Sequence, residues 1–153
     1  MRAAPTASGT SLGEEPTAGE LARRYLDRTE ARDVDGLLAL LADEAVTELP
    51  FAPGGMPSRY EGAADYAAFA RRIFSRSLAS VSVSDVCVSE AGAELAFVEL
   101  RSDCRPMAGG TYRNRYVVRV EAAGGLITLW REYFDPLALL AVKDDGATAR
   151  DGS

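Results

Sequence analysis

The first half of the chain contains three stretches in which apolar residues recur at helical spacing. The first begins at Thr17, where a Thr-x-x-Glu sequence is typical of a capping box. Asp33 is placed to cap a second, leucine-rich helix, and a third helix is expected over residues 63–77. Residues 45–51 alternate between apolar and polar side chains. This alternation predicts a short strand between the second and third helices, followed by a loop rich in glycine and proline.

In the second half the period changes from that of a helix to that of a strand. Residues 81–88, 95–104, 111–121 and 126–134 are rich in β-branched and aromatic side chains, and turn sequences separate them. Four strands joined by short turns predict an antiparallel meander. We therefore expect the α+β class, as a cone-shaped α+β barrel in which three N-terminal helices pack on a curved, mostly antiparallel sheet and enclose a pocket.

The same pattern sets the limits of the folded domain. Residues 1–16 are rich in Ala, Gly, Ser, Thr and Pro, which predicts a disordered N-terminal tail. Residues 17–143 are expected to form one domain that ends with a short helix at 137–140, and residues 144–153 are expected to form a disordered polar tail. The length of 153 residues suits one domain with a core and a pocket.

Composition narrows the choice of partners and compartment. The formal charge of −6 argues against nucleic acid or an anionic membrane surface as the main partner. No apolar run approaches the roughly 18 residues of a membrane span, and the N-terminus lacks the apolar centre of a signal peptide. The two cysteines are not arranged as Cys-x-x-Cys, which fits a reducing compartment and predicts a cytoplasmic protein.

The chain contains no histidine, and this restricts its chemistry more than any other feature of the composition. Ser-His-Asp and Cys-His machinery is excluded, and so are the usual zinc sites. Acid-base chemistry must therefore use Asp, Glu, Tyr, Lys or Arg. We expect a site that works without a metal ion or an organic cofactor.

The last predicted strand carries the first candidate for such chemistry. Trp130, Glu132 and Phe134 alternate along it and share one face. A carboxylate between two aromatic side chains is costly to bury unless it has partners or a chemical task. Glu132 is therefore a candidate catalytic residue.

A second row of candidates lies on the strand predicted at 95–104. Phe97, Arg101 and Asp103 share one face of that strand. If this row faces Glu132 across an apolar cavity, burial raises the pKa of one carboxyl while the guanidinium keeps the other ionised. The two carboxyls could then act as acid and base, so the predicted catalytic residues are Glu132, Asp103 and Arg101.

The alternative is structural. Arg101 and Asp103 could lie at a solvated strand end, with Glu132 paired to a neighbouring arginine such as Arg113 or Arg115.

Residues 130–136 read Trp-Arg-Glu-Tyr-Phe-Asp-Pro and follow a Gly-Gly turn. They resemble the final strand of the SnoaL-like branch of the nuclear transport factor 2-like superfamily. Residues 49–62 and 24–46 resemble other parts of the same family, and the resemblance covers roughly residues 18–142. It implies a pocket-forming α+β fold and, through an uncovered sheet face, a homodimer.

Limonene-epoxide-hydrolase-like members carry Arg-x-Asp on a central strand and a second acid in the last strand. Arg101, Asp103 and Glu132 are similar in position. In those enzymes one acid deprotonates water and the other protonates the epoxide. The residues that hold the water would fall near Thr47 and Leu49, and neither matches.

Two further branches resemble the chain at single positions. Ketosteroid-isomerase-like members use a tyrosine in the first helix, which Tyr25 resembles, but Leu49 occupies the position of their base. Glu48 is one residue away and is expected to face the other side of the strand. Phenazine-biosynthesis proteins have a glutamate where Glu132 stands, although their histidine is missing here.

The resemblance and the pattern together predict cofactor-free acid-base catalysis on an apolar small molecule: cyclisation, isomerisation or epoxide opening of a polyketide or terpenoid intermediate of secondary metabolism. The alternatives are a non-catalytic small-molecule-binding or accessory protein and, less favoured, a protein–protein adaptor. The residues expected to contact the small molecule are Tyr25, Leu49, Phe51, Tyr60, Tyr66, Phe69, Phe97, Trp130 and Phe134.

Overall fold

The computed structural model describes residues 13–148, with side chains up to residue 142. In chain order the elements are α1 (Ala18–Glu30), α2 (Val34–Leu38), β1 (Leu41–Glu48), β2 (Arg59–Glu61), α3 (Ala63–Arg71), the π-helical segment η1 (Arg72–Ser77), β3 (Leu78–Glu90), β4 (Leu95–Pro106), β5 (Tyr112–Ala123), β6 (Leu126–Phe134) and α4 (Pro136–Thr148). Within residues 13–148, no helix combines the length and the apolar character that a bilayer span requires.

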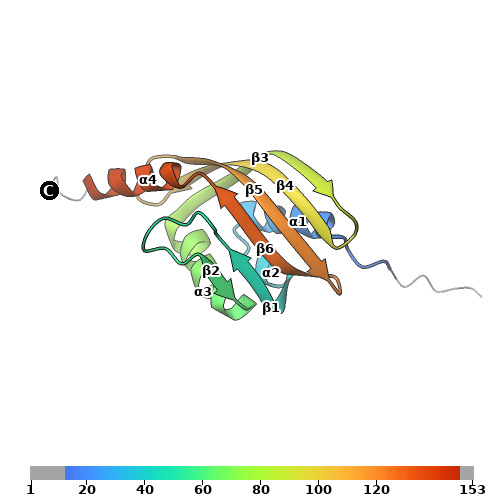
Figure 1. Cartoon of the computed structure of the whole chain (residues 1–153). Helices are drawn as coiled ribbons and strands as arrows, with labels where there is room; N and C mark the ends of the chain where they lie inside the picture. The colour runs from blue at the N-terminus through green and yellow to red at the C-terminus, as the bar shows by residue number, and fades with distance from the viewer. Residues whose placement is uncertain (1–12, 149–153) are drawn as a thin grey trace, which may run out of the picture.

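The strands form one curved sheet in the order β2-β1-β6-β5-β4-β3. Neighbouring strands are antiparallel except β1 and β6, which run parallel. Figure 1 shows this sheet in front of α1 and α2, with α3 beside β2. The α+β class, the helices on a curved sheet and the antiparallel meander are confirmed, and the sheet curves without closing on itself.

The start of α1 follows from its sequence. The Thr17 hydroxyl accepts a hydrogen bond from the Glu20 backbone N–H at 3.1 Å, and the Glu20 carboxylate accepts one from the Thr17 N–H at 2.8 Å. This capping box satisfies two backbone donors that the first turn leaves free. One face of α1 is buried against the sheet, through Leu21, Tyr25, Leu26 and small residues between them.

Several boundaries differ from those that the sequence predicts. The second helix ends at Leu38, and β1 begins at Leu41 rather than at residue 45, because Leu41 and Ala42 are buried in the sheet rather than on a helix. The short strand β2 was not predicted. The helix predicted at 63–77 is confirmed, as α3 followed by η1.

The closing helix predicted at 137–140 is longer in the structure. Helix α4 continues to Thr148, so the backbone of residues 144–148 is helical where a disordered tail was predicted. Residues 1–12 and 149–153 of the two predicted tails lie outside the described residues.

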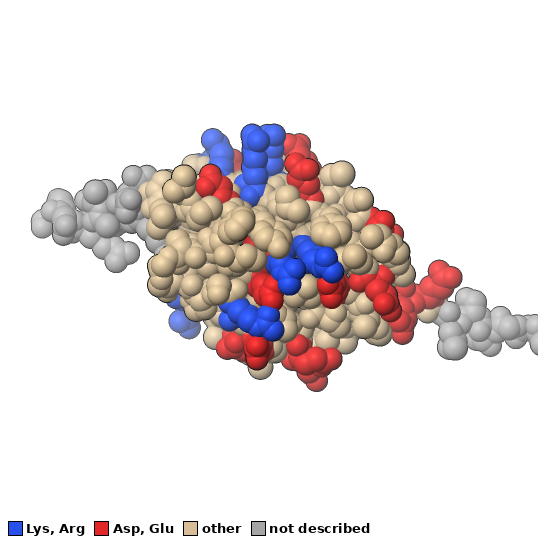
Figure 2. All heavy atoms as spheres, in the orientation of Figure 1, with Lys and Arg blue, Asp and Glu red and all other residues tan. Residues whose placement is uncertain are grey.

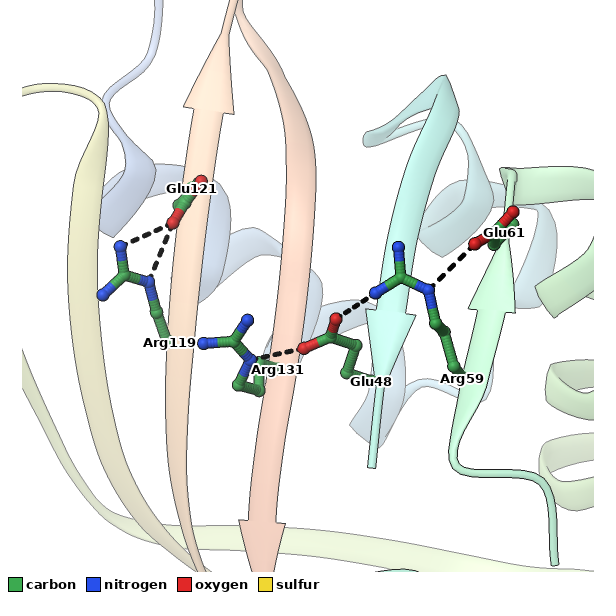
Figure 3. A network of polar contacts seen from close by, with 6 residues as sticks. All are labelled: Glu48, Arg59, Glu61, Arg119, Glu121 and Arg131. Carbon is green, nitrogen blue, oxygen red and sulfur yellow. Dashed lines mark hydrogen bonds and ion pairs between the residues drawn. The ribbon is translucent and has the colours of Figure 1, made fainter. Parts of the chain in front are cut away.

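Ion pairs on the outer face of the sheet connect the three neighbouring strands β2, β1 and β6. The Glu48 carboxylate on β1 accepts from Arg131 on β6 and from Arg59 on β2, and Arg59 also pairs with Glu61 at 3.0 Å. Figure 3 shows Glu48 between the two guanidinium groups. In Figure 2, basic and acidic side chains lie next to one another over this part of the sheet. The Glu48 side chain is only 16% exposed, so its charge is screened less than those of its partners.

Replacing Glu48 by Gln should therefore weaken the join between β1 and its two neighbours. We expect the free energy of unfolding, measured in urea, to fall by about 1 kcal/mol. This figure already allows for the weakening of both ion pairs by the solvent exposure of the arginines. The control is Glu121→Gln, because Glu121 pairs with Arg119 on the same strand and joins no strands. Equal losses in the two variants would show that Glu48 does not connect the strands.

Candidate active site

The inner face of the sheet encloses a cavity of about 180 Å³ against α1, α3 and η1. Cross-strand partners share a face of a sheet, and the register aligns Val98 with Val118 and Val118 with Glu132. Val118 and Glu132 from this row line the cavity. Its other walls are mostly apolar and aromatic, and seven of the predicted site residues line it: Tyr25, Leu49, Tyr66, Phe69, Trp130, Glu132 and Phe134.

Among the described residues that line this cavity, Glu132 is the one acidic or basic side chain. Its Oε2 accepts a hydrogen bond from Trp130 Nε1 at 3.1 Å, and within the described residues it forms no ion pair. Burial raises the pKa of the Glu132 carboxyl, and the hydrogen bond from Trp130 opposes that shift by favouring the ionised form. A carboxyl with a raised pKa is suited to exchange protons near neutral pH.

Two phenols face Glu132 from the helices. Tyr25 on α1 and Tyr66 on α3 are hydrogen-bonded through their hydroxyl oxygens at 2.9 Å, and the Tyr25 ring stacks on Trp130 with 3.8 Å between centroids. Burial raises the pKa of both phenols, and the charge of Glu132 adds to the effect, so both hydroxyls stay protonated. One hydroxyl donates to the other, which leaves the pair with one proton to donate elsewhere.

A second set of phenols approaches from β5. Tyr112 OH accepts from Asn114 Nδ2 at 2.7 Å, and Tyr116 OH lies 3.0 Å from Ser102 Oγ and 3.4 Å from Tyr112 OH. The Tyr112 oxygen accepts from both Asn114 and Tyr116, which leaves its own proton for a group in the cavity. Burial raises the pKa of Tyr112 and of Tyr116, and the charge of Glu132 contributes to both shifts.

Sequence reasoning missed Tyr112 and Tyr116. The signal was present in β5, where Tyr112, Tyr116 and the buried Val118 and Val120 all belong to one alternating row. Tyr112, Tyr116 and Val118 of this row line the cavity, and Tyr116 is the partner of Phe134 on β6.

The predicted cluster of Glu132 with Arg101 and Asp103 does not form. Arg101 pairs with Asp85 on β3 at 3.1 Å, and Asp103 pairs with Arg113 on β5 at 2.8 Å. Both pairs are partly exposed on the outer face of the sheet. The expectation of a solvated strand end is therefore correct for these two residues, whereas the alternative of an arginine partner for Glu132 is wrong.

Phe97 was also predicted to line the cavity, and this too is wrong. It is 39% exposed, and the Arg119 guanidinium lies over its ring, 5.7 Å from the centroid. The register explains the error, because Phe97 is the partner of Arg119, which is in turn the partner of the outward-facing Arg131. The neighbouring residues Ala96 and Val98 are the ones that point inward and are buried.

Two further predicted contacts lie near the cavity without lining it. Phe51 is 54% exposed and packs edge-on against Tyr133, with 5.5 Å between ring centroids. Tyr60 is buried behind the cavity wall, where its ring packs against Phe69 and Tyr66 at 5.1 and 5.6 Å. Tyr60 thus supports two residues that do line the cavity.

A curved sheet folded over helices around an aromatic cavity places the chain in the nuclear transport factor 2-like class of folds. Residues 22–130 match the SnoaL-like domain, and the chain belongs to that family.

The chain is similar to the uncharacterized protein YesE of Bacillus subtilis, with 26% identity over 129 residues that cover 84% of this chain and 88% of the relative. It is also similar to a solved structure from Bacillus subtilis that is provisionally named an isomerase. The TM-score is 0.74 and the identity 25%, over 81% of this chain and 90% of that one. A third similar protein, from Pseudomonas putida and provisionally named a polyketide cyclase, has a TM-score of 0.71 and 23% identity, over 82% of this chain and 96% of that one. At that identity it supports the fold alone.

The environment of Glu132 predicts how stability changes when the residue is replaced by Gln. Its folded pKa lies above its unfolded pKa, so the ionised carboxylate destabilises the folded protein as pH rises through that interval. Gln resembles the protonated acid and carries no such penalty. We expect Glu132→Gln to unfold at a higher temperature than the wild type at pH 7, and the difference to vanish below about pH 4.

Glu99→Gln is the control for this measurement, because Glu99 is exposed on the outer face of the sheet. Thermal unfolding of the three proteins between about pH 3 and pH 8 makes the comparison. A Glu132→Gln variant that is less stable than the wild type at pH 7 would contradict the account of a carboxylate penalised by burial.

Proposed function

We propose that this protein catalyses cofactor-free proton transfer on a small apolar carbonyl compound, with Glu132 as the base and acid. The observation that carries the proposal is the isolation of Glu132 in an aromatic cavity, with Trp130 fixing one carboxylate oxygen and phenol donors around it. The SnoaL-like family and the Bacillus subtilis structure provisionally named an isomerase support the same class of chemistry.

The proposed reaction begins with the ionised Glu132 removing a proton from a carbon next to a carbonyl. The electron pair of that C–H bond forms the enolate double bond, and the carbonyl oxygen takes the negative charge. Donors already in place for that oxygen are the free proton of the Tyr25–Tyr66 pair and the hydroxyl of Tyr112. In isomerisation, protonated Glu132 then returns the proton to another carbon of the conjugated enolate. In cyclisation, the enolate carbon attacks a second carbonyl, and Glu132 returns the proton to the alkoxide oxygen that this attack forms.

Of the three reactions that the sequence suggests, we favour cyclisation and isomerisation over epoxide opening. The epoxide reaction of the resembling enzymes uses two acids bridged by an arginine. Arg101 and Asp103 lie on the outer face of the sheet, away from Glu132. A polyketide intermediate is a suitable substrate class because it presents neighbouring carbonyl groups. The cytoplasmic location, the homodimer and independence from cofactors stay predictions.

A binding or accessory protein is the second candidate. The observation in its favour is that Glu132 has no second acidic or basic side chain beside it in the cavity. A binder would use Glu132 and the phenols only to orient a polar group of the ligand.

Deuterium exchange separates these two candidates. We expect the protein to accelerate exchange of the acidic C–H protons of 2-indanone, a small bicyclic ketone, in D₂O as followed by NMR. Glu132→Gln should reduce the rate by a factor of about 100 or more, because it removes the base. The rate should rise with pH about a midpoint above the usual range for glutamate, because burial raises the pKa of Glu132 and only the ionised form accepts a proton.

Asp103→Asn serves as the matched control and should keep the wild-type rate, because Asp103 faces the other side of the sheet. Binding of the ketone without any acceleration of exchange would favour the binding protein. Wild-type exchange in Glu132→Gln would remove Glu132 from the mechanism.

A further inference from the structure

A second hollow of about 370 Å³ lies at the mouth of the cavity. The loop at residues 55–57, η1 and the start of α4 form its walls. Met56, Ile73 and Leu139 line both spaces, so the hollow and the cavity meet at these three side chains. The two spaces are therefore adjacent.

The volumes indicate that the inner cavity alone is too small for a ligand of drug-like size. A cavity of about 150 Å³ holds a single benzene ring, whereas sites for drug-sized molecules are about 300–1,000 Å³. The inner space of about 180 Å³ thus holds little more than one ring, and the outer hollow of about 370 Å³ is the adjacent space for the rest of a larger molecule.

Arg72 is the charged side chain that lines the outer hollow. Its guanidinium lies over the ring of Phe69, 5.6 Å from the centroid, and Phe69 is itself a wall of the inner cavity. Arg72 is exposed, and it takes part in none of the ion pairs formed among the side chains of residues 13–142. A guanidinium held on an aromatic ring without a carboxylate partner is ready to receive one.

The inner cavity and the outer hollow carry side chains of opposite charge. The described lining of the inner cavity contains Glu132 and no basic side chain, so an anionic group placed there would meet a low dielectric and a like charge. Burial raises the pKa of the Tyr60 phenol. The charge of Arg72 opposes that shift, which shows that the guanidinium lies near Tyr60, and the charge of Asp65 adds to the shift. An anionic group is therefore disfavoured inside and favoured beside Arg72.

We propose that the outer hollow is a subsite for a carboxylate, and that the protein takes amphipathic acids whose apolar end enters the cavity while the carboxylate pairs with Arg72. The choice of substrate class rests on the function proposed above, whereas the binding preference itself does not. Such an orientation would place a carbonyl of the apolar end beside Glu132 and leave the acid at the mouth.

Fluorescence of Trp130, which is the single tryptophan of the chain and lines the cavity, provides the measurement. The probes are ω-phenyl carboxylates from 3-phenylpropionate to 6-phenylhexanoate and the alcohols of the same length, with calorimetry as a second readout. We expect at least one chain length to bind about tenfold more tightly as the carboxylate than as the alcohol. Arg72→Leu should abolish this preference while leaving binding of the alcohol unchanged.

Arg76→Leu is the matched control, because Arg76 is exposed on the same segment and lines neither space. It should keep the preference. Equal binding of acid and alcohol by the wild type, a preference that survives in Arg72→Leu, or no binding of any probe at millimolar concentration would each overturn the subsite. Loss of the preference in Arg72→Leu together with no exchange of 2-indanone would overturn the proposed reaction and leave the subsite standing.

Discussion

The position of β6 between β5 and β1 fixes both faces of the sheet. Because side chains alternate along a strand, the register that turns Glu132 towards the helices also turns Arg131 outward, where it meets Glu48 on β1. A slip of one residue would bury Arg131 and expose Trp130, which is almost fully buried in the structure. The ion pair outside and the aromatic packing inside therefore require the same register.

That register places a carboxyl where it costs stability. Glu132 receives one hydrogen bond, from Trp130, and no cation offsets its charge. The large ring of Trp130 is held in turn by stacking on Tyr25. An apolar residue at this position would pack without the penalty of desolvation, so the carboxyl is explained better by chemistry than by packing.

Alternation along the sequence identifies which residues share a row, but the direction of each row depends on the strands beside it. For β6 the direction could be predicted, because Trp130 and Phe134 leave little doubt about the buried side. For β4 the charged row was expected to face the cavity, and the opposite row does so because Ala96 and Val98 are buried against α1 and β5. Strand partners far apart in sequence, such as Val118 and Glu132, settle the matter, and a single sequence does not contain that pairing.

The outward position of Arg101 and Asp103 limits the chemistry that the cavity can perform. Because Arg101 and Asp103 lie on the outer face, the described lining of the cavity keeps one carboxyl and four phenols. Burial is the largest cause of the raised pKa of each of these groups. Such a set can move one proton and stabilise one oxyanion, but it offers no interior cation to hold an anionic substrate. Recognition of a charged group is thereby separated from proton transfer. The cation that could recognise such a group is the guanidinium of Arg72, which lies on an aromatic ring beside the outer hollow.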